Sequence, residues 1–270
     1  MIDAIAYASG AICGVALDHR DSLRVAARTR DYPEDNASLR SLKTELARGL
    51  APAASVVLLD TELGIDAMAE LAGTPLVVPL EAQGYEAVGK GRLTTLLSDI
   101  DPERAAALGA VGCKLLLPYR PDLADAARKQ EDTAAGVIAS CLAAGVLSII
   151  EPLVYGEVPA LGGTVVETAK RLARLGPDLL KLQYPGDASY CAALSDVCGG
   201  VPWVLLGGGT DEATFLAHVR DACTAGARGY IVGRTAWDTA LVTDAEARER
   251  AIAGRAAFLV RCRAVVEATP

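Results

Sequence analysis

Eight short apolar segments recur along the chain and alternate with longer segments rich in Ala, Arg and Glu. Each apolar segment is continuous rather than alternating, which is typical of strands that are covered on both faces of a parallel sheet. The predicted strands span residues 12–18, 55–60, 76–80, 111–117, 147–153, 178–183, 201–206 and 229–233.

The segments between these strands carry helical patterns with recognisable ends. Helices are predicted at 124–144, which stops at Gly145, and at 164–175, which stops at Gly176 and Pro177. A third is predicted at 210–225 with Thr210 as its N-cap. The last, at 245–267, is long enough that we expect it to close the bottom of the fold.

The regular spacing of the strand ends predicts a (β/α)8 TIM barrel. Ends near residues 18 and 233 bracket seven intervals with a mean of about 31 residues, which suits one strand-helix unit. The long first interval predicts an extra loop at residues 30–36. A doubly wound sheet would carry a Gly-rich turn after its first strand, but His19-Arg20-Asp21-Ser22 stands there. With no linker visible, we predict a single α/β TIM-barrel domain over residues 1–270.

Composition restricts the classes of partner. Hydrophobic residues make up 51% of the 270 residues and the net charge is −8, without a cluster of Lys and Arg. This predicts a globular protein that does not bind nucleic acid. No apolar run approaches the roughly 20 residues of a membrane span, and the first residues lack the basic segment of a signal peptide. We therefore expect no membrane partner.

Cysteine and histidine counts restrict the chemistry. Seven Cys, an odd number without Cys-x-x-Cys spacing, are typical of a reduced cytoplasm. Two His are too few for a usual catalytic zinc site, so we predict no metal. The mean hydropathy of +0.28 favours buried subunit contacts and hence a homo-oligomer.

Charged residues stand at the carboxyl ends of the predicted strands, where a barrel builds its active face. Burying an unpaired charge costs several kcal/mol. The large number of charged residues at the strand ends therefore favours a functional site over a set of ion pairs that only stabilises the barrel. In order, these residues are Asp18, Asp60, Glu81, Lys114, Glu151 and Lys181.

Lys181 is the candidate nucleophile. Its place in Leu179-Leu180-Lys181-Leu182 puts it on the inward face of a strand, where desolvation and the nearby Lys114 favour the neutral amine that attacks a carbonyl. Glu151 lies on the strand between the two lysines and is the candidate proton carrier. Tyr155 is a second candidate, although packing is its simpler role.

Glycine-rich turns follow the last two predicted strands, where barrels often bind phosphate. Asp18 and Asp60 are expected to hold substrate hydroxyls or to neutralise Lys114. His19 and Arg20 could meet a second anionic end of a substrate, although for Arg20 a position on the surface of a helix is favoured. The candidate phosphate ligands are Gly208, Gly209, Gly233 and Arg234.

The chain resembles the class I aldolases that include tagatose-1,6-bisphosphate aldolase and sulfofructosephosphate aldolase. The resemblance implies a TIM barrel, a Schiff base on Lys181, Glu151 as acid/base, the phosphate ligands above and no cofactor. Two positions depart from the family: His19, where Gln is frequent, and Gln183, where an acidic residue is common. The matching blocks are Ala16-Leu17-Asp18-His19-Arg20, Leu58-Leu59-Asp60, Lys114-Leu115-Leu116-Leu117-Pro118-Tyr119, Ile150-Glu151-Pro152-Leu153, Leu180-Lys181-Leu182 and Gly233-Arg234-Thr235-Ala236-Trp237.

The resemblance implies cleavage of a ketose 1-phosphate to dihydroxyacetone phosphate and an aldehyde. Candidate substrates are tagatose or fructose 1,6-bisphosphate and 6-sulfofructose 1-phosphate. Three alternatives remain: a related aldolase of inositol degradation, a phosphosugar isomerase or synthase that uses Glu151 and Lys114 without a covalent adduct, and a phosphosugar-binding regulator. Each alternative keeps a small phosphorylated sugar as the partner.

Overall fold

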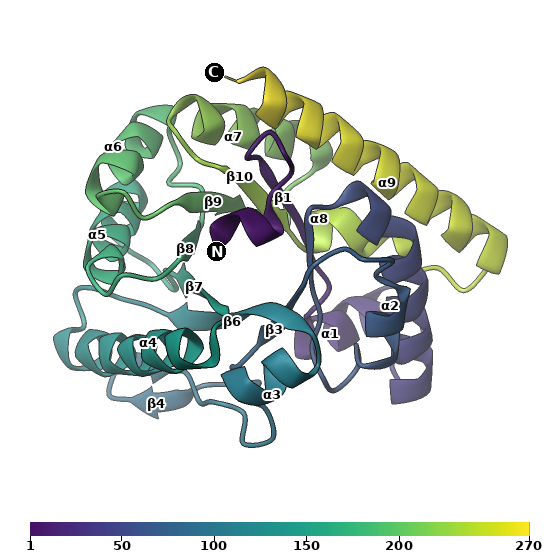
Figure 1. Cartoon of the computed structure of the whole chain (residues 1–270), viewed down its shortest axis with the longest axis horizontal. Coiled ribbons are helices and arrows are strands. Elements are labelled where there is room, and N and C mark those ends of the chain that lie inside the picture. The colour runs from purple at the N-terminus through teal and green to yellow at the C-terminus, as the bar shows by residue number, and fades with distance from the viewer. Residues whose placement is uncertain (270) are drawn as a thin grey trace.

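The computed structural model describes residues 1–269, and its centre is a closed barrel of eight parallel strands surrounded by helices (Figure 1). The strands follow one another around the barrel in the order β1-β10-β9-β8-β7-β6-β3-β2. The predicted TIM barrel is therefore confirmed, and each predicted apolar run overlaps one barrel strand. These strands are β1 (Ile12–Ala16), β2 (Val56–Leu58), β3 (Leu76–Pro79), β6 (Ala110–Pro118), β7 (Leu147–Leu153), β8 (Leu179–Leu182), β9 (Trp203–Leu206) and β10 (Gly229–Val232).

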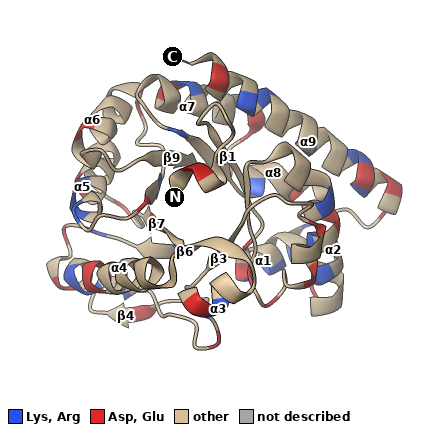
Figure 2. Ribbon diagram, viewed as in Figure 1, with Lys and Arg blue, Asp and Glu red and all other residues tan. Residues whose placement is uncertain are grey.

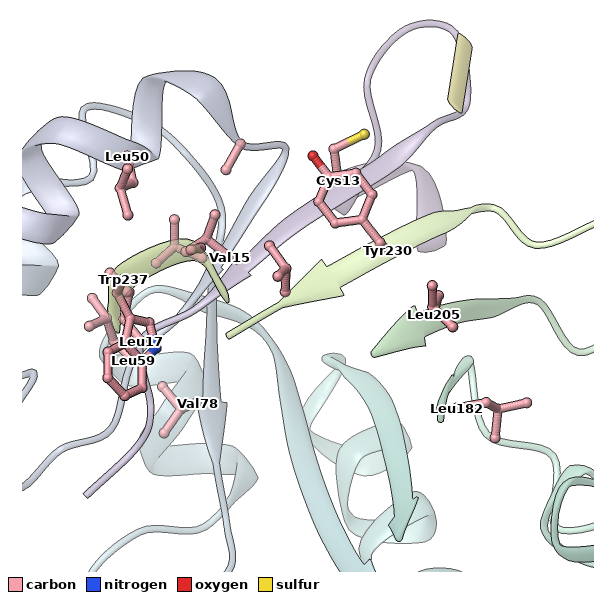
Figure 3. Close-up of a cluster of buried hydrophobic side chains, with 14 of the residues drawn as sticks. Cys13, Val15, Leu17, Leu50, Leu59, Val78, Leu182, Leu205, Tyr230 and Trp237 are labelled. Carbon is pink, nitrogen blue, oxygen red and sulfur yellow. The ribbon is translucent and has the colours of Figure 1, made fainter. Parts of the chain in front are cut away.

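Alternation along the strands divides the core into two parts. One set of side chains fills the barrel: Ile12 of β1, Val56 of β2 and Ile149 of β7 belong to one buried cluster. The other set faces the surrounding helices, as Cys13 does beside Tyr230 and Leu17 does beside Trp237 in Figure 3. Because successive side chains point to opposite faces, residues two positions beyond an inward residue also point inward, and this rule fixes which strand-end residues reach the barrel mouth.

The floor of the barrel is closed by the N-terminus. A 3-10 turn, η1 (Ile2–Ile5), lies at the barrel opening near the strand starts, and Ile5 packs with Ile12 and Leu147 (Figure 1). The prediction that the last helix closes the bottom was wrong. That helix, α9 (Ala245–Ala268), packs on α2 (Asn36–Leu50) and α7 (Glu212–Thr224) in the outer ring, because its apolar residues face these helices.

The other helices follow the predicted pattern with small shifts. Helix α4 (Ala124–Ala144) has the predicted bounds, whereas α5 (Leu161–Ala173) begins three residues earlier than expected. Helix α7 starts after Asp211, whose side chain accepts a hydrogen bond from Thr214 N, so Asp211 rather than Thr210 is the N-cap. The remaining helices are α1 (Asp21–Thr29), α3 (Pro102–Ala107), α6 (Ala188–Cys198) and α8 (Arg234–Trp237), with short 3-10 turns η2 (Ala51–Ala53), η3 (Asp66–Glu70) and η4 (Asp238–Ala240).

The extra length between β1 and β2 is largely helical. Helix α1 occupies the residues directly after β1, and residues 30–35 join it to α2. A second insertion follows β3, where the antiparallel strands β4 (Glu86–Val88) and β5 (Gly91–Leu93) form a hairpin beside α4. Ala82 N donates to Thr95 O, so the chain returns to the end of β3 after the hairpin.

Charged residues of both signs are mixed along the outer helices, including α4 and α9 (Figure 2). Within residues 1–269, no helix combines the length and apolar character that a membrane span requires.

Candidate active site

Strand register brings the two predicted lysines and Glu151 to one side of the barrel mouth. Ile150 of β7 pairs with Leu180 of β8, so the next residues, Glu151 and Lys181, lie side by side. Lys114 of β6 pairs with Ile149 and therefore starts two residues deeper than Glu151. All three side chains point inward, and the Lys114 stem must rise by roughly 6–7 Å to bring its ammonium to the level of the carboxylates.

Lys181 and Glu151 are in direct contact. Lys181 Nζ lies 2.9 Å from Glu151 Oε2, and the two side chains are 5% and 9% exposed. Lys181 has no other carboxylate within ion-pair distance among residues 1–269. Glu151 is therefore the carboxylate that the Lys181 amine contacts.

Lys114 is surrounded by carboxylates. Its ammonium lies 2.8 Å from Asp18 Oδ2 and 3.6 Å from Glu151 Oε2, and it donates to Glu81 Oε1. Burial alone would lower the pKa of Lys114, but the attraction of Asp18, Glu81 and Glu151 outweighs it and raises that pKa. Burial likewise opposes ionisation of Asp18, yet the attraction of Lys114 holds the pKa of Asp18 well below the usual range. Lys114 and Asp18 are therefore charged at neutral pH.

The lysines and carboxylates open onto a cavity of about 380 Å³ at the carboxyl ends of the strands. Its deep wall carries the charged residues described above, and its outer wall is made by the start of α1 and the segment that follows β3. The lining residues are Asp18, His19, Arg20, Asp21, Ser22, Glu81, Ala82, Gln83, Gly84, Tyr85, Lys114, Leu116, Glu151 and Lys181.

Asp60 does not reach this cavity. Although it points inward after β2, it is 0% exposed, pairs with Lys43 of α2 and accepts a hydrogen bond of 2.6 Å from Leu63 N. Burial lowers the pKa of Lys43 although Asp60 opposes this. The structure thus brings Asp18 to Lys114 but ties Asp60 to a helix outside the barrel.

Lys43 is the partner that sequence reasoning missed. It lies on the face of α2 that also buries Leu39, Leu42 and Leu46. A lysine at an apolar position of an amphipathic helix is the signal that could have revealed a buried ion pair.

The prediction of a surface position for Arg20 was wrong. Arg20 is 2% exposed, donates to Glu81 O at 2.8 Å and faces Glu81 Oε1 at 3.9 Å. The Glu81 carbonyl and carboxylate offset part of the cost of burying the guanidinium, while Arg20 Nε has no hydrogen-bond partner among the described residues. Arg20 therefore helps to hold the segment after β3 against the mouth of the barrel.

His19 packs beside the last strand. Its ring lies 5.1 Å from the Trp237 ring, and a side chain on Gly233 would overlap it. Burial lowers the pKa of His19 to about 3, so the imidazole is neutral at ordinary pH. Gly233 is thus required for the position of His19, independently of any ligand.

The predicted phosphate turns adjoin a second and larger hollow of about 760 Å³, lined by Gly209 and Arg234 and sharing Ser22 with the lysine cavity. Gly208 and Gly209 both have positive φ (62° and 75°), which glycine adopts without strain. Arg234 donates to Gly208 O at 3.1 Å. The two turns are adjacent, since β9 pairs with β10.

Tyr155, the alternative proton carrier, lies outside the cavity lining. Its hydroxyl accepts a hydrogen bond of 3.0 Å from Arg92 N, and its ring lies beneath two guanidinium groups, of Arg92 and Arg120. These contacts agree with the packing role that the sequence favoured for it.

A closed parallel barrel with paired lysines and carboxylates at its carboxyl-terminal mouth defines a TIM-barrel protein whose site is suited to carbonyl chemistry. The model of the DeoC/LacD family aldolases matches residues 12–239, and the chain belongs to this family. The resemblance to class I aldolases is thereby confirmed.

Two similar proteins are tagatose 1,6-diphosphate aldolases. Tagatose 1,6-diphosphate aldolase of Listeria monocytogenes serotype 4b is 29% identical over 69% of this chain, and the match spans 60% of that protein. The Staphylococcus aureus strain RF122 protein of the same name is 27% identical over 89% of this chain and 84% of its own length.

Solved structures agree in fold. An archaeal fructose-1,6-bisphosphate aldolase, with its catalytic Lys bound to a carbinolamine intermediate, has a TM-score of 0.67 at 18% identity and 98% coverage of both chains. Fructose-bisphosphate aldolase from Slackia heliotrinireducens has a TM-score of 0.69 at 18% identity, covering 98% of this chain and 87% of that one. At these identities the likeness supports the barrel fold alone.

Proposed function

We propose that this protein is a class I aldolase that cleaves a ketose 1-phosphate to dihydroxyacetone phosphate and an aldehyde through a Schiff base on Lys181. The observation that carries the proposal is the 2.9 Å contact between Lys181 and Glu151 inside the cavity. The Lys114 ammonium is held by three carboxylates, whereas the Lys181 amine contacts only Glu151, which Lys114 also contacts. We therefore assign Lys181 as the amine that gives up its proton.

The first half of the reaction forms the covalent intermediate. Lys181 passes a proton to Glu151 and attacks the C2 carbonyl of the substrate with its free electron pair. The attacking nitrogen then loses a second proton to the former carbonyl oxygen, which gives the neutral carbinolamine. Glu151 returns the proton to the hydroxyl of the carbinolamine, which leaves as water, and a protonated imine remains.

Carbon-carbon cleavage follows from this imine. Glu151 accepts the proton of the C4 hydroxyl, the C3–C4 bonding electrons move toward the imine nitrogen, and the aldehyde departs. The enamine then takes a proton at C3, and water hydrolyses the imine to release dihydroxyacetone phosphate. Lys114 stays protonated and keeps the Glu151 carboxyl in place through its 3.6 Å contact.

The C1 phosphate is assigned to the turns after β9 and β10. Backbone N–H groups of Gly208, Gly209 and Gly233 and the guanidinium of Arg234 supply the donors, and Arg234 exchanges its present acceptor, Gly208 O, for phosphate oxygens. Asp18 is placed at the cavity wall, where it can accept from a substrate hydroxyl while neutralising Lys114. For Asp60 a role in ordering β2 and α2 replaces direct substrate binding.

Tagatose 1,6-bisphosphate, fructose 1,6-bisphosphate and 6-sulfofructose 1-phosphate are the candidate substrates. The two bisphosphates are the substrates in the names of similar proteins. A panel of these three compounds, assayed for triose phosphate release with EDTA present, measures the preference among them.

Borohydride trapping tests the covalent step. Wild-type protein incubated with dihydroxyacetone phosphate and borohydride should gain the mass of the reduced adduct on the peptide that contains Lys181. Lys181→Met should abolish both the adduct and cleavage, and Glu151→Gln should lower kcat by about 10²–10⁴-fold. The exposed Lys170→Met is the matched control and should behave as wild type.

An unlabelled Lys181 peptide under saturating ligand would refute the proposal and favour an isomerase or synthase without a covalent intermediate. Ligand binding without cleavage, unchanged by Lys181→Met, would indicate a phosphosugar-binding regulator instead.

Assembly and location remain predictions. We propose a homo-oligomer, which light scattering after size-exclusion chromatography tests directly. The seven cysteines are all buried and unpaired, which supports the proposed residence in a reducing compartment such as the cytoplasm.

A further inference from the structure

The hairpin formed by β4 and β5 directly follows Tyr85, which lines the cavity, and is anchored to the neighbouring elements of the barrel. Thr94 Oγ1 donates to Leu116 O of β6 at 2.7 Å, and Gly91 lies so close to Ala126 of α4 that a side chain at position 91 would overlap it. The strand β5 is therefore held beside the carboxyl end of β6.

Arg92 of β5 carries a guanidinium without an acidic partner. Its Cζ lies 4.7 Å from the centre of the Tyr155 ring and 5.9 Å from that of Tyr85. Among residues 1–269 no carboxylate lies within ion-pair distance of it, whereas Arg120, on the same Tyr155 ring, makes two hydrogen bonds of 2.8 Å to Asp122. Two aromatic rings thus position a cation whose N–H donors remain available.

Tyr85 connects this guanidinium with the site. Its side chain lines the lysine cavity and also contacts Arg92. Burial raises the pKa of Tyr85, and Glu81 raises it further while Arg92 opposes the change. The phenol therefore lies within electrostatic range of both the carboxylates of the cavity and Arg92.

The position of the hairpin matches the far end of a bound substrate. In the closed strand order, β10 lies opposite β6 and β9 lies opposite β3. A ketose phosphate with its C1 phosphate on the turns after β9 and β10, and C2 at Lys181 of β8, extends toward the rim above β3 and β6. The hairpin follows β3 and bonds to β6, so its residues meet the aldehyde half.

We propose that Arg92, positioned by Tyr85 and Tyr155, is the specificity residue that binds a second anionic group at the distal end of a ketose 1-phosphate. The inference rests on the proposed function and adds a recognition element for the aldehyde half. Phosphate, sulfonate and carboxylate share the oxygen acceptors that a guanidinium fork binds.

The test is a ratio of substrates. We would measure kcat/KM for fructose 1,6-bisphosphate and for fructose 1-phosphate, which ends in a free hydroxyl. Arg92→Met should lower the ratio of the two values about tenfold through KM for the bisphosphate, since charge-assisted hydrogen bonds at an exposed rim are lost. Arg92→Lys should retain part of the preference. Lys90→Met, which removes a positive charge from the same hairpin, should leave the ratio at the wild-type value.

Parallel arms with a 6-sulfonate or a 6-carboxylate in place of the 6-phosphate identify the anion that Arg92 prefers. The bisphosphate KM of the wild type should also rise with salt more steeply than that of Arg92→Met, because screening weakens exposed charge contacts.

Three outcomes would overturn the inference while leaving the Schiff base intact: a wild-type protein without preference for a distal anion, an unchanged ratio in Arg92→Met, or equal losses on both substrates. Dihydroxyacetone phosphate has no distal half, so its borohydride adduct on Lys181 reports the covalent step separately. Failure of that labelling would overturn both proposals.

Discussion

The buried pair of Lys43 and Asp60 gives the sharpest test of what holds this barrel together. Lys43→Met retains most of the apolar stem but removes the ammonium, which leaves the Asp60 carboxylate fully buried with Leu63 N as a remaining donor. Breaking a buried ion pair typically costs 3–5 kcal/mol. Because Leu63 N still donates, we expect a loss of about 3 kcal/mol, a large part of the 5–15 kcal/mol that stabilises a typical domain.

A substitution of Asp60 completes a double-mutant cycle with Lys43→Met. Asp60→Asn keeps an oxygen for Leu63 N but carries no charge, so the double variant Lys43→Met/Asp60→Asn should recover about 2 kcal/mol of that loss. Urea unfolding followed through the fluorescence of the buried Trp203 and Trp237 measures these changes. With a slope of roughly 3 kcal/mol/M, the midpoint of Lys43→Met should fall by about 1 M.

The same variants separate a structural role from a catalytic one. Asp60 does not line the lysine cavity, so KM of the double variant should remain within about twofold of the wild-type value, well below the tenfold that one lost charge-assisted contact can cost. A tenfold rise in KM with an unchanged unfolding midpoint would refute this reasoning and would return Asp60 to the substrate, as the sequence had suggested.

Two further predictions concern the last strand. His19, whose side chain is 25% exposed, has a pKa of about 3 in the fold, whereas the unfolded chain protonates near 6.5. The wild type therefore loses stability as pH falls below 6.5, and between pH 7 and 5 His19→Gln should lose about 2 kcal/mol less in urea unfolding; equal losses would contradict the burial argument. Gly233→Ala should lower Tm and reduce borohydride adduct formation with dihydroxyacetone phosphate, because the new methyl group displaces the His19 ring; an unchanged Tm and adduct yield would show that the turn accommodates it.

The local pattern of the sequence determined the barrel and the residues that face into it. Continuous apolar runs at intervals of about 31 residues specify strand-helix units, and the strict alternation of a strand places Glu151 and Lys181 on its inner side whatever surrounds them. These properties depend on near neighbours in the chain, so they can be predicted from the sequence alone.

Tertiary structure alone decided which charges meet. Asp60 and Glu81 both follow a strand and both point inward, yet Asp60 pairs with Lys43 of α2 while Glu81 pairs with Lys114 at the cavity. Arg20 is buried against the segment after β3, where it donates to the carbonyl of Glu81 at 2.8 Å. The partners in each case are 17 to 61 residues apart in the chain. An ion pair depends on distances of a few ångströms that only the packing of α2, β3 and β6 sets.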